Sequence, residues 1–262
     1  MKHKTTIYAI ITLILGIAVL VGFFMWVNKH AEAPTVDSSA TTNNQTDTLV
    51  SITPTMIPVD HDSYLTSVTG SIPQFSQASD EFNKKISDGV MGDISDFNKN
   101  ASADYDAHLK IDGDAFQKEF ASSKGGYYYF NVTSDVVQSN ENDISVVIRE
   151  ELYSGGAHPA HNVISYNYDV KNKKELSITD FASLQNLSSQ ARDILTKKFL
   201  GDANGAVLDD NSKQMLYDGT DPSHLENFNT FTFTSTDVTV YFGEYQVAPY
   251  VFGEQEVTIP RK

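Results

Sequence analysis

The feature that most constrains this chain is an apolar segment close to its amino end. Residues 7–27, IYAIITLILGIAVLVGFFMWV, carry no charge over 21 positions. A helix of this length spans roughly 31 Å, which matches the hydrocarbon core of a bilayer. A helix that is apolar on every side is not expected on the surface of a globular domain. We therefore predict a single-pass transmembrane helix at 7–27, preceded by a short tail at 1–6.

Charges beside this segment predict its orientation. Lys2 and Lys4 precede it, and short positive tails stay in the cytoplasm, so we expect the remaining chain outside the cell membrane. Trp26 stands where an interfacial aromatic residue belongs. A cleaved signal peptide is the alternative, because residues 31–33 fit a small-x-small cleavage site. The length of the apolar run and Pro34 after the site favour an uncleaved anchor.

The rest of the chain divides by composition and periodicity. Residues 28–58 are rich in Thr, Ser, Asn and Pro and predict a flexible stalk. Beyond the stalk we predict two α+β subdomains, at 59–140 and 141–262, that meet near 139–142.

Periodicity predicts the elements of these subdomains. Apolar residues recur every three or four positions over 79–100 and 180–200, which predicts one helix in each subdomain. Alternation and apolar runs predict strands at 64–75, 126–138, 143–153, 162–170, 228–234, 238–242 and 256–259, with a short helix near Met215. Short turns link most strands, so the fold class is α+β with mostly antiparallel sheets.

Charge and cysteine content exclude several classes of function. Beyond the segment at 7–27 and Lys29, 16 Lys and Arg face 34 Asp and Glu, a net charge of −18. Such a surface repels nucleic acid and anionic lipid and suits a basic partner. The chain has no cysteine, which excludes disulfides and thiolate-bound zinc. We expect no cofactor, no metal and no nucleic-acid partner.

The stretch YSGGAHPAH, which begins at Tyr153, is the main candidate site. His158 and His161 could hold a metal or act as a base, but a metal site needs a third ligand, and the intervening glutamate of helical zinc peptidases is missing. The other interpretation is a wide hairpin end between two strands, in which Gly155 and Gly156 allow a close approach to another strand. In that case we expect His158 to hydrogen-bond backbone.

Three segments together resemble a known family: YSGGAHPAHNVISYNYDV, KELSITDFA and VTVYFGEYQVAPYVFGEQEVTIP. They resemble the extracytoplasmic domain-of-unknown-function family 3298, which occurs in RsiV-like anti-sigma factors and in the amino-terminal part of PdaC-like peptidoglycan deacetylases. The preceding region resembles the companion domain of that family. The strongest signatures are the GGAH stretch and the closing motif from Tyr245 through Tyr250 to Pro260.

The resemblance implies a membrane-anchored, extracytoplasmic binding or sensing module of the bacterial cell envelope. Its ligand would be a glycan, such as a peptidoglycan fragment, or a basic protein such as lysozyme, which RsiV-like modules recognise. The binding residues expected from the two signatures are Tyr153, Gly155, Gly156, His158, His161, Tyr245 and Tyr250. The alternative is a peptidoglycan-modifying enzyme, or an accessory domain of one, that uses the GGAHxxH loop. We expect a binding module rather than a catalyst and assign no catalytic residue.

Overall fold

The structure, a computed structural model, describes residues 50–122, 128–155, 157–201 and 209–261. The predicted tail, transmembrane segment and most of the predicted stalk lie outside these residues. Within the described ranges, no helix is both long enough and apolar enough to cross a membrane. These ranges form an α+β fold with mostly antiparallel sheets, as predicted.

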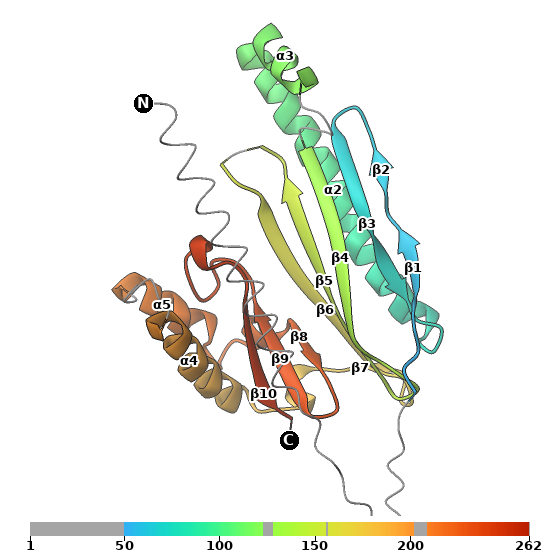
Figure 1. Cartoon of the computed structure of the whole chain (residues 1–262), viewed down its shortest axis with the longest axis vertical. Helices are drawn as coiled ribbons and strands as arrows, with labels where there is room; N and C mark the ends of the chain where they lie inside the picture. Colours follow the sequence, from blue (N-terminus) through green and yellow to red (C-terminus); the bar gives the residue numbers. More distant parts are fainter. Residues whose placement is uncertain (1–49, 123–127, 156, 202–208, 262) are drawn as a thin grey trace, which may run out of the picture. The chain divides into compact units, whose positions relative to one another are not determined.

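The N-terminal region, residues 50–175, forms a seven-stranded sheet (Figure 1). Its strands are β1 (Thr55–Pro58), β2 (His61–Asp62), β3 (Thr66–Gln74), β4 (Tyr128–Ser139), β5 (Asp143–Tyr153), β6 (Ala160–Asp169) and β7 (Lys174–Glu175). They are ordered β1-β3-β4-β5-β6-β7, and β2 also pairs with β3. Only β3 and β4 pair in parallel, because helices α2 (Asp80–Asp112) and α3 (Asp114–Ser122) connect them.

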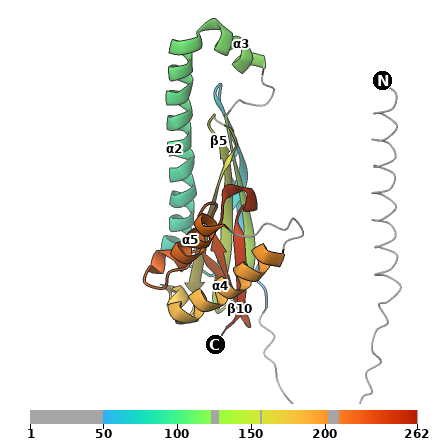
Figure 2. The same ribbon diagram turned by 90° about the vertical axis from the view of Figure 1, so that its left-hand side faces the viewer.

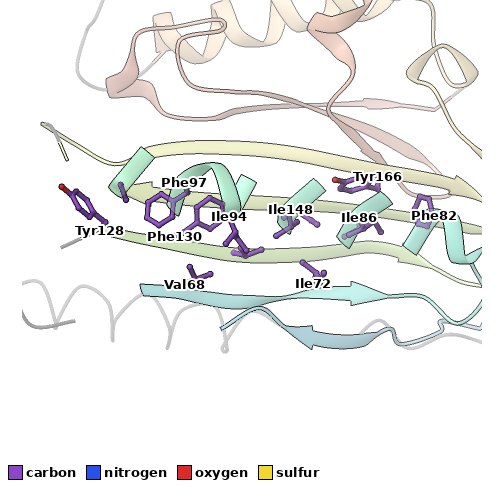
Figure 3. Close-up of a cluster of buried hydrophobic side chains, with 14 of the residues drawn as sticks. Val68, Ile72, Phe82, Ile86, Ile94, Phe97, Tyr128, Phe130, Ile148 and Tyr166 are labelled. Atoms are coloured by element: carbon purple, nitrogen blue, oxygen red, sulfur yellow. The ribbon is translucent and has the colours of Figure 1, made fainter. Parts of the chain in front are cut away.

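Helix α2 runs along one face of this sheet (Figure 2). It begins at Ser79, whose hydroxyl accepts a hydrogen bond from the Phe82 backbone N–H at 3.2 Å. Its buried residues recur at helical spacing: Phe82, Ile86, Val90, Ile94, Phe97, Ala101 and Tyr105. They pack on apolar side chains of the strands, such as Phe130 and Ile148 (Figure 3). Ala101 and Tyr105 continue this row, so the helix extends twelve residues beyond the predicted end at Asn100.

The C-terminal region, residues 176–261, has a separate core and a smaller sheet. Its elements are η1 (Ile178–Asp180), α4 (Leu184–Gly201), α5 (Asp210–Gly219), η2 (Leu225–Phe228), β8 (Phe231–Phe233), β9 (Asp237–Phe242), η3 (Tyr250–Phe252) and β10 (Gln255–Pro260). The strands are ordered β10-β9-β8 and are antiparallel. Among the described residues, α5 confirms the short helix predicted near Met215, whereas α3 in the N-terminal region had not been predicted.

The first turn of the predicted helix at 180–200 is separate from the rest. Ser177 and Asp180 form a capping box at the start of the short 3-10 helix η1. The α-helix proper starts only at Leu184. A start signal in the sequence therefore marked a different, shorter element.

Strand β8 joins the two regions through polar side chains on the large sheet. Ile144 and Val146 of β5 belong to the core under α2, so Ser145 between them points to the opposite face. There the Ser145 hydroxyl accepts a hydrogen bond from the Phe233 N–H (2.9 Å), and the Asn167 amide donates to the Phe231 carbonyl (2.7 Å). The Ser165 hydroxyl accepts from the Phe231 N–H at 2.8 Å. We call Ser145, Ser165 and Asn167 the polar seam.

Two predicted boundaries need correction. Strands β4 and β5, on either side of 139–142, pair as one hairpin, so no subdomain boundary lies at residue 140. The change from the first core to the second falls between Val170 and Leu176. The end of the predicted stalk is also ordered, because β1 pairs with β3 and the Ile52 N–H donates to the Ser139 carbonyl at 2.8 Å. Strand alternation had located these segments without showing which strands are neighbours.

Candidate functional site

The end of the β5–β6 hairpin meets the connection between β9 and β10. The His158 ring stacks on the Tyr250 ring, with centroids 3.9 Å apart. The Tyr250 hydroxyl donates a hydrogen bond to the Pro159 carbonyl at 3.1 Å. The His158 Nδ1–H donates to the same carbonyl at 2.8 Å, which confirms that this histidine bonds backbone. Two signatures that are about 90 residues apart in sequence thus form one surface.

His161 lies in the same place but does not converge with His158. Its Nδ1 is 2.7 Å from Oε1 of Glu244, a glutamate in the β9–β10 connection whose side chain is 12% exposed. Among the described residues, no three His, Asp or Glu side chains are grouped to hold a metal ion. The geometry therefore assigns His158 to the shape of the loop and His161 to a contact with a carboxylate.

Tyr245 is exposed and has an unusual backbone conformation. Its φ is 62°, in the left-handed region that bulky side chains rarely adopt, and the residue is 57% exposed. The turn that imposes this conformation is held by Gln246, whose N–H donates to the Gly243 carbonyl and whose side chain accepts from the Gly243 N–H. The Tyr245 ring lies 5.7 Å from that of Tyr250, centroid to centroid. The fold thus holds two tyrosine rings side by side at the surface.

A second pair of tyrosines lies on the strands beneath. The rings of Tyr129 on β4 and Tyr153 on β5 are stacked, with centroids 5.9 Å apart. The Tyr129 hydroxyl donates to Oε1 of Glu151 at 2.9 Å. Burial, and then the hydrogen bond to Glu151, raise the pKa of Tyr129. Burial, and then the negative charge of Glu244, raise the pKa of Tyr250. We call this set the tyrosine–glutamate site: Tyr129, Glu151, Tyr153, His158, His161, Glu244, Tyr245 and Tyr250.

A cavity of about 440 Å³ adjoins this site, within the range of small-ligand pockets. It is lined by Asn131, Thr133, Arg149, Glu150, Glu151, His161, Asn162, Glu244, Gly253 and Glu254. Arg149 is held by three carboxylates: Nη1 is 2.6 Å from Asp135, and Nη2 is 3.0 Å from Glu254 and 2.9 Å from Glu256. Strands of the N-terminal region and the β9–β10 connection therefore build the cavity together.

The structure tests the predicted role of Gly155 in the hairpin end but not that of Gly156. Gly155 has a φ of 96°, and a Cβ atom there would lie 3.1 Å from Oδ2 of Asp104. The close approach expected for this loop is thus real, but the neighbour is helix α2 rather than a strand. Gly156 lies outside the described residues.

A carboxyl pair, buried Glu150 and half-buried Asp93, lies at the interface with α2, on the other face of the sheet. Glu150 is 1% exposed and accepts a hydrogen bond from the Asn162 amide at 3.0 Å. Burial, opposed by the Asn162 bond and reinforced by the charge of Asp93 on α2, raises the pKa of Glu150 to about 7. Burial also raises the pKa of Asp93. Burial and the neighbouring charge of Asp93 thus both favour the protonated form of Glu150.

Sequence reasoning missed the acidic members and one tyrosine of the site. Glu151 is a diagonal neighbour of Tyr129 across β4 and β5, because Tyr129 pairs with Tyr153, and this relation depends on strand register. Glu244 directly precedes the closing motif, and it reaches His161 only because the connection folds back over the sheet. The alternation of β5, with Arg149, Glu151 and Tyr153 at every second position, was the available signal.

Comparisons with known proteins agree with the sequence motifs. Residues 59–161 match the family model described as deacetylase PdaC, and residues 174–262 match that described as protein of unknown function (DUF3298). The peptidoglycan-N-acetylmuramic acid deacetylase PdaC of Bacillus subtilis (strain 168) is 32% identical over 136 residues. This alignment covers 50% of the present chain but 27% of that protein, so the chain spans about a quarter of its relative.

Two solved structures of the DUF3298 family are also similar. That from Bacteroides fragilis NCTC 9343 has a TM-score of 0.49 and that from Pseudomonas aeruginosa PAO1 a TM-score of 0.46. Each is 17% identical and covers 79% of this chain and 89% of its own. The resemblance stated from the GGAH stretch and the closing motif is confirmed: the chain carries a PdaC-type region followed by a DUF3298 region.

Proposed function

We propose that this chain is a glycan-binding module of the cell envelope and that the tyrosine–glutamate site is its binding surface. The observation that carries the proposal is Tyr245. A bulky residue in left-handed backbone costs free energy, and such strain concentrates at binding and catalytic positions. Here the strain keeps an aromatic ring exposed beside Tyr250.

The chemistry of the surface suits a sugar. The faces of aromatic rings offer apolar area with little conformational freedom to lose, onto which the C–H face of a pyranose can pack. Carboxylates accept hydrogen bonds, so Glu151 and Glu244 can bind sugar hydroxyls beside the rings. The adjoining cavity supplies amide and hydroxyl groups from Asn131 and Thr133. The polar cavity thus adjoins the aromatic surface and shares Glu151, His161 and Glu244 with it.

We propose peptidoglycan as the source of the glycan. The relative from Bacillus subtilis is named as a deacetylase of peptidoglycan N-acetylmuramic acid. In keeping with this substrate, the proposed location is outside the cell membrane, with residues 7–27 as a single-pass anchor and the amino end in the cytoplasm. Protease treatment of intact cells tests the location, because the proposal expects cleavage of the described residues without lysis.

A basic protein such as lysozyme is the second candidate ligand, favoured by the charge of −18 beyond the anchor. An envelope enzyme that uses the GGAHxxH loop has less support, because the His158 ring is occupied by Tyr250 and the Pro159 carbonyl. A binding module needs only the surface that the rings and carboxylates provide.

Binding of the full chain to soluble peptidoglycan fragments and to a basic lysozyme, measured by calorimetry, tests the proposal. Tyr245→Ala and Tyr250→Ala are expected to weaken glycan binding on the order of tenfold each, about 1.4 kcal/mol. Tyr217→Ala is the matched control, because Tyr217 lies on α5 and is 55% exposed, as Tyr245 is 57% exposed. Glycan binding that survives both substitutions would reject this site. Binding to lysozyme alone would favour the second candidate.

A further inference from the structure

We infer that the glycan bound at the tyrosine–glutamate site carries a free amino group, held as its ammonium ion between the carboxylates and the tyrosine rings. This inference rests on the proposed function and specifies the class of ligand.

The charge of the cavity is the first argument. Its lining residues include Glu151, Glu244 and Glu254, and among the described residues that line it Arg149 is the one arginine or lysine. Arg149 already faces Glu254 together with Asp135 and Glu256, which lie beside the cavity. Even with His161 protonated against Glu244, negative charge exceeds positive charge at this surface. A ligand with a carboxylate or phosphate here would be repelled, whereas a cation would be attracted.

The tyrosine rings are the second argument. Cations bind over aromatic faces, and groups of aromatic rings recognise ammonium ligands. Tyr129 donates its hydroxyl proton to Glu151, so the carboxylate is fixed beside the stacked rings of Tyr129 and Tyr153. Tyr250, stacked on His158, brings another ring to the same place. Burial raises the pKa of both Tyr129 and Tyr250, and the neighbouring Glu151 and Glu244 raise it further, which agrees with an excess of negative charge.

An acetylated sugar would use this surface less well than a free amine. The acetamido group is neutral and would cover carboxylates without replacing the water that solvates them. The free amine arises when water hydrolyses the acetamido C–N bond, which gives acetate and the amine. A hydrolytic deacetylation of amino sugars is therefore the class of reaction that supplies this ligand.

Two oligosaccharides of equal length separate the alternatives: a glucosamine tetramer and an N-acetylglucosamine tetramer. With the full chain at slightly acidic pH and low salt, we expect the glucosamine tetramer to bind on the order of tenfold more tightly. Raised salt is expected to reduce this difference, because exposed charges are screened. Glu151→Gln and Glu244→Gln are expected to abolish most of the preference. Glu141→Gln, at an exposed position in the β4–β5 turn, changes the net charge equally and is expected to keep it.

Each outcome decides a different point. Equal affinity for both tetramers, or tighter binding of the acetylated one, would overturn the amine inference and leave glycan binding intact. A preference that survives both glutamine substitutions would reject the assigned carboxylates, provided that thermal unfolding shows the variants to be folded. Absence of binding to either tetramer and to peptidoglycan fragments would overturn the proposed function itself.

Discussion

The two regions of this molecule both place helices on a mostly antiparallel sheet, yet they differ in how far we expect each to fold alone. The N-terminal region has strands of up to 12 residues and a 33-residue helix with a continuous buried row. The C-terminal region has strands of three to six residues, and the outer edge of β8 is bonded by the polar seam of the other region. The comparison teaches that a region with its own core and its own family match can still depend on its neighbour for backbone hydrogen bonds.

The largest expected effect tests this dependence directly. Ile86→Ala, in the fully buried row of α2, should lower the free energy of unfolding by about 2–5 kcal/mol and destabilise both regions together. Leu195→Ala, in the core of the C-terminal region, should cost a similar amount but leave the N-terminal region folded. Hydrogen exchange, followed separately in peptides of each region, measures the two responses. If both variants reduced protection from hydrogen exchange equally in both regions, the C-terminal region would not depend on the N-terminal region more than the reverse.

Buried Glu150, paired with Asp93, makes the stability of the N-terminal region depend on pH. The pKa of Glu150 in the folded protein, about 7, lies above its ordinary value of 4.5, so folding is favoured by protonation. This contribution is complete below about pH 4.5 and is lost as pH rises through 7, an effect on the order of 3 kcal/mol. The groups that face Glu150 are Asp93 on α2 and Asn162 and Tyr166 on β6.

Denaturant unfolding at pH 5 and pH 8 measures this effect. Glu150→Gln should remove most of the difference in the free energy of unfolding between the two pH values. Asp143→Gln would not be a clean control, because burial raises the pKa of Asp143 as well. Glu141→Gln, at the exposed turn, should leave the difference unchanged. If wild type and Glu150→Gln show the same difference in the free energy of unfolding between pH 5 and pH 8, the carboxyl pair is not the source of that difference.

The polar seam gives the next smaller effect. Asn167→Leu leaves the Phe231 carbonyl without its amide donor, which should cost about 1–3 kcal/mol. We expect the backbone amides of β8 and β9 to exchange hydrogen faster, while the amides of α2 keep their protection from exchange. Asn100→Leu, at an exposed position of α2, is the matched control and should change stability little. Unchanged exchange in β8 would show that the seam does not couple the regions.

The smallest effect concerns Tyr245 and has the opposite sign. Tyr245→Gly removes a side chain from left-handed backbone and should raise the free energy of unfolding by about 1 kcal/mol. The same variant should weaken glycan binding, because the exposed ring is gone. Lys173→Gly, at the other non-glycine position of positive φ among the described residues, should stabilise the fold similarly without affecting binding. A loss of stability in Tyr245→Gly would show that the ring contributes more to packing than the backbone strain costs.

Much of the fold could be predicted because single elements leave a local pattern. The bounds of β5, Asp143–Tyr153, follow from alternation alone, and the row from Phe82 to Phe97 identifies α2. The parallel pairing of β3 with β4 could not be predicted, since alternation reports faces rather than partners. The prediction of a subdomain boundary at residue 140 was wrong for a similar reason, because a hairpin turn and a domain linker contain the same kinds of residue.

The candidate site was predicted in part. The motifs indicated His158, Tyr245 and Tyr250, which the structure brings together. Glu151 and Glu244 carry no motif, and their role depends on the β9–β10 connection folding over β5 and β6. The left-handed conformation of Tyr245 has no signal in sequence, because a glycine or asparagine would mark such a position and a tyrosine does not.

The polar seam also has a consequence for the order of assembly. Ser145, Ser165 and Asn167 present their groups to β8 only after β5 and β6 have paired in register, since a slip by one residue would turn all three to the opposite face. Synthesis of the chain delivers β5 and β6 well before β8. We therefore expect the large sheet to serve as a template on which the small sheet forms, with the sequence of translation matching the sequence of folding.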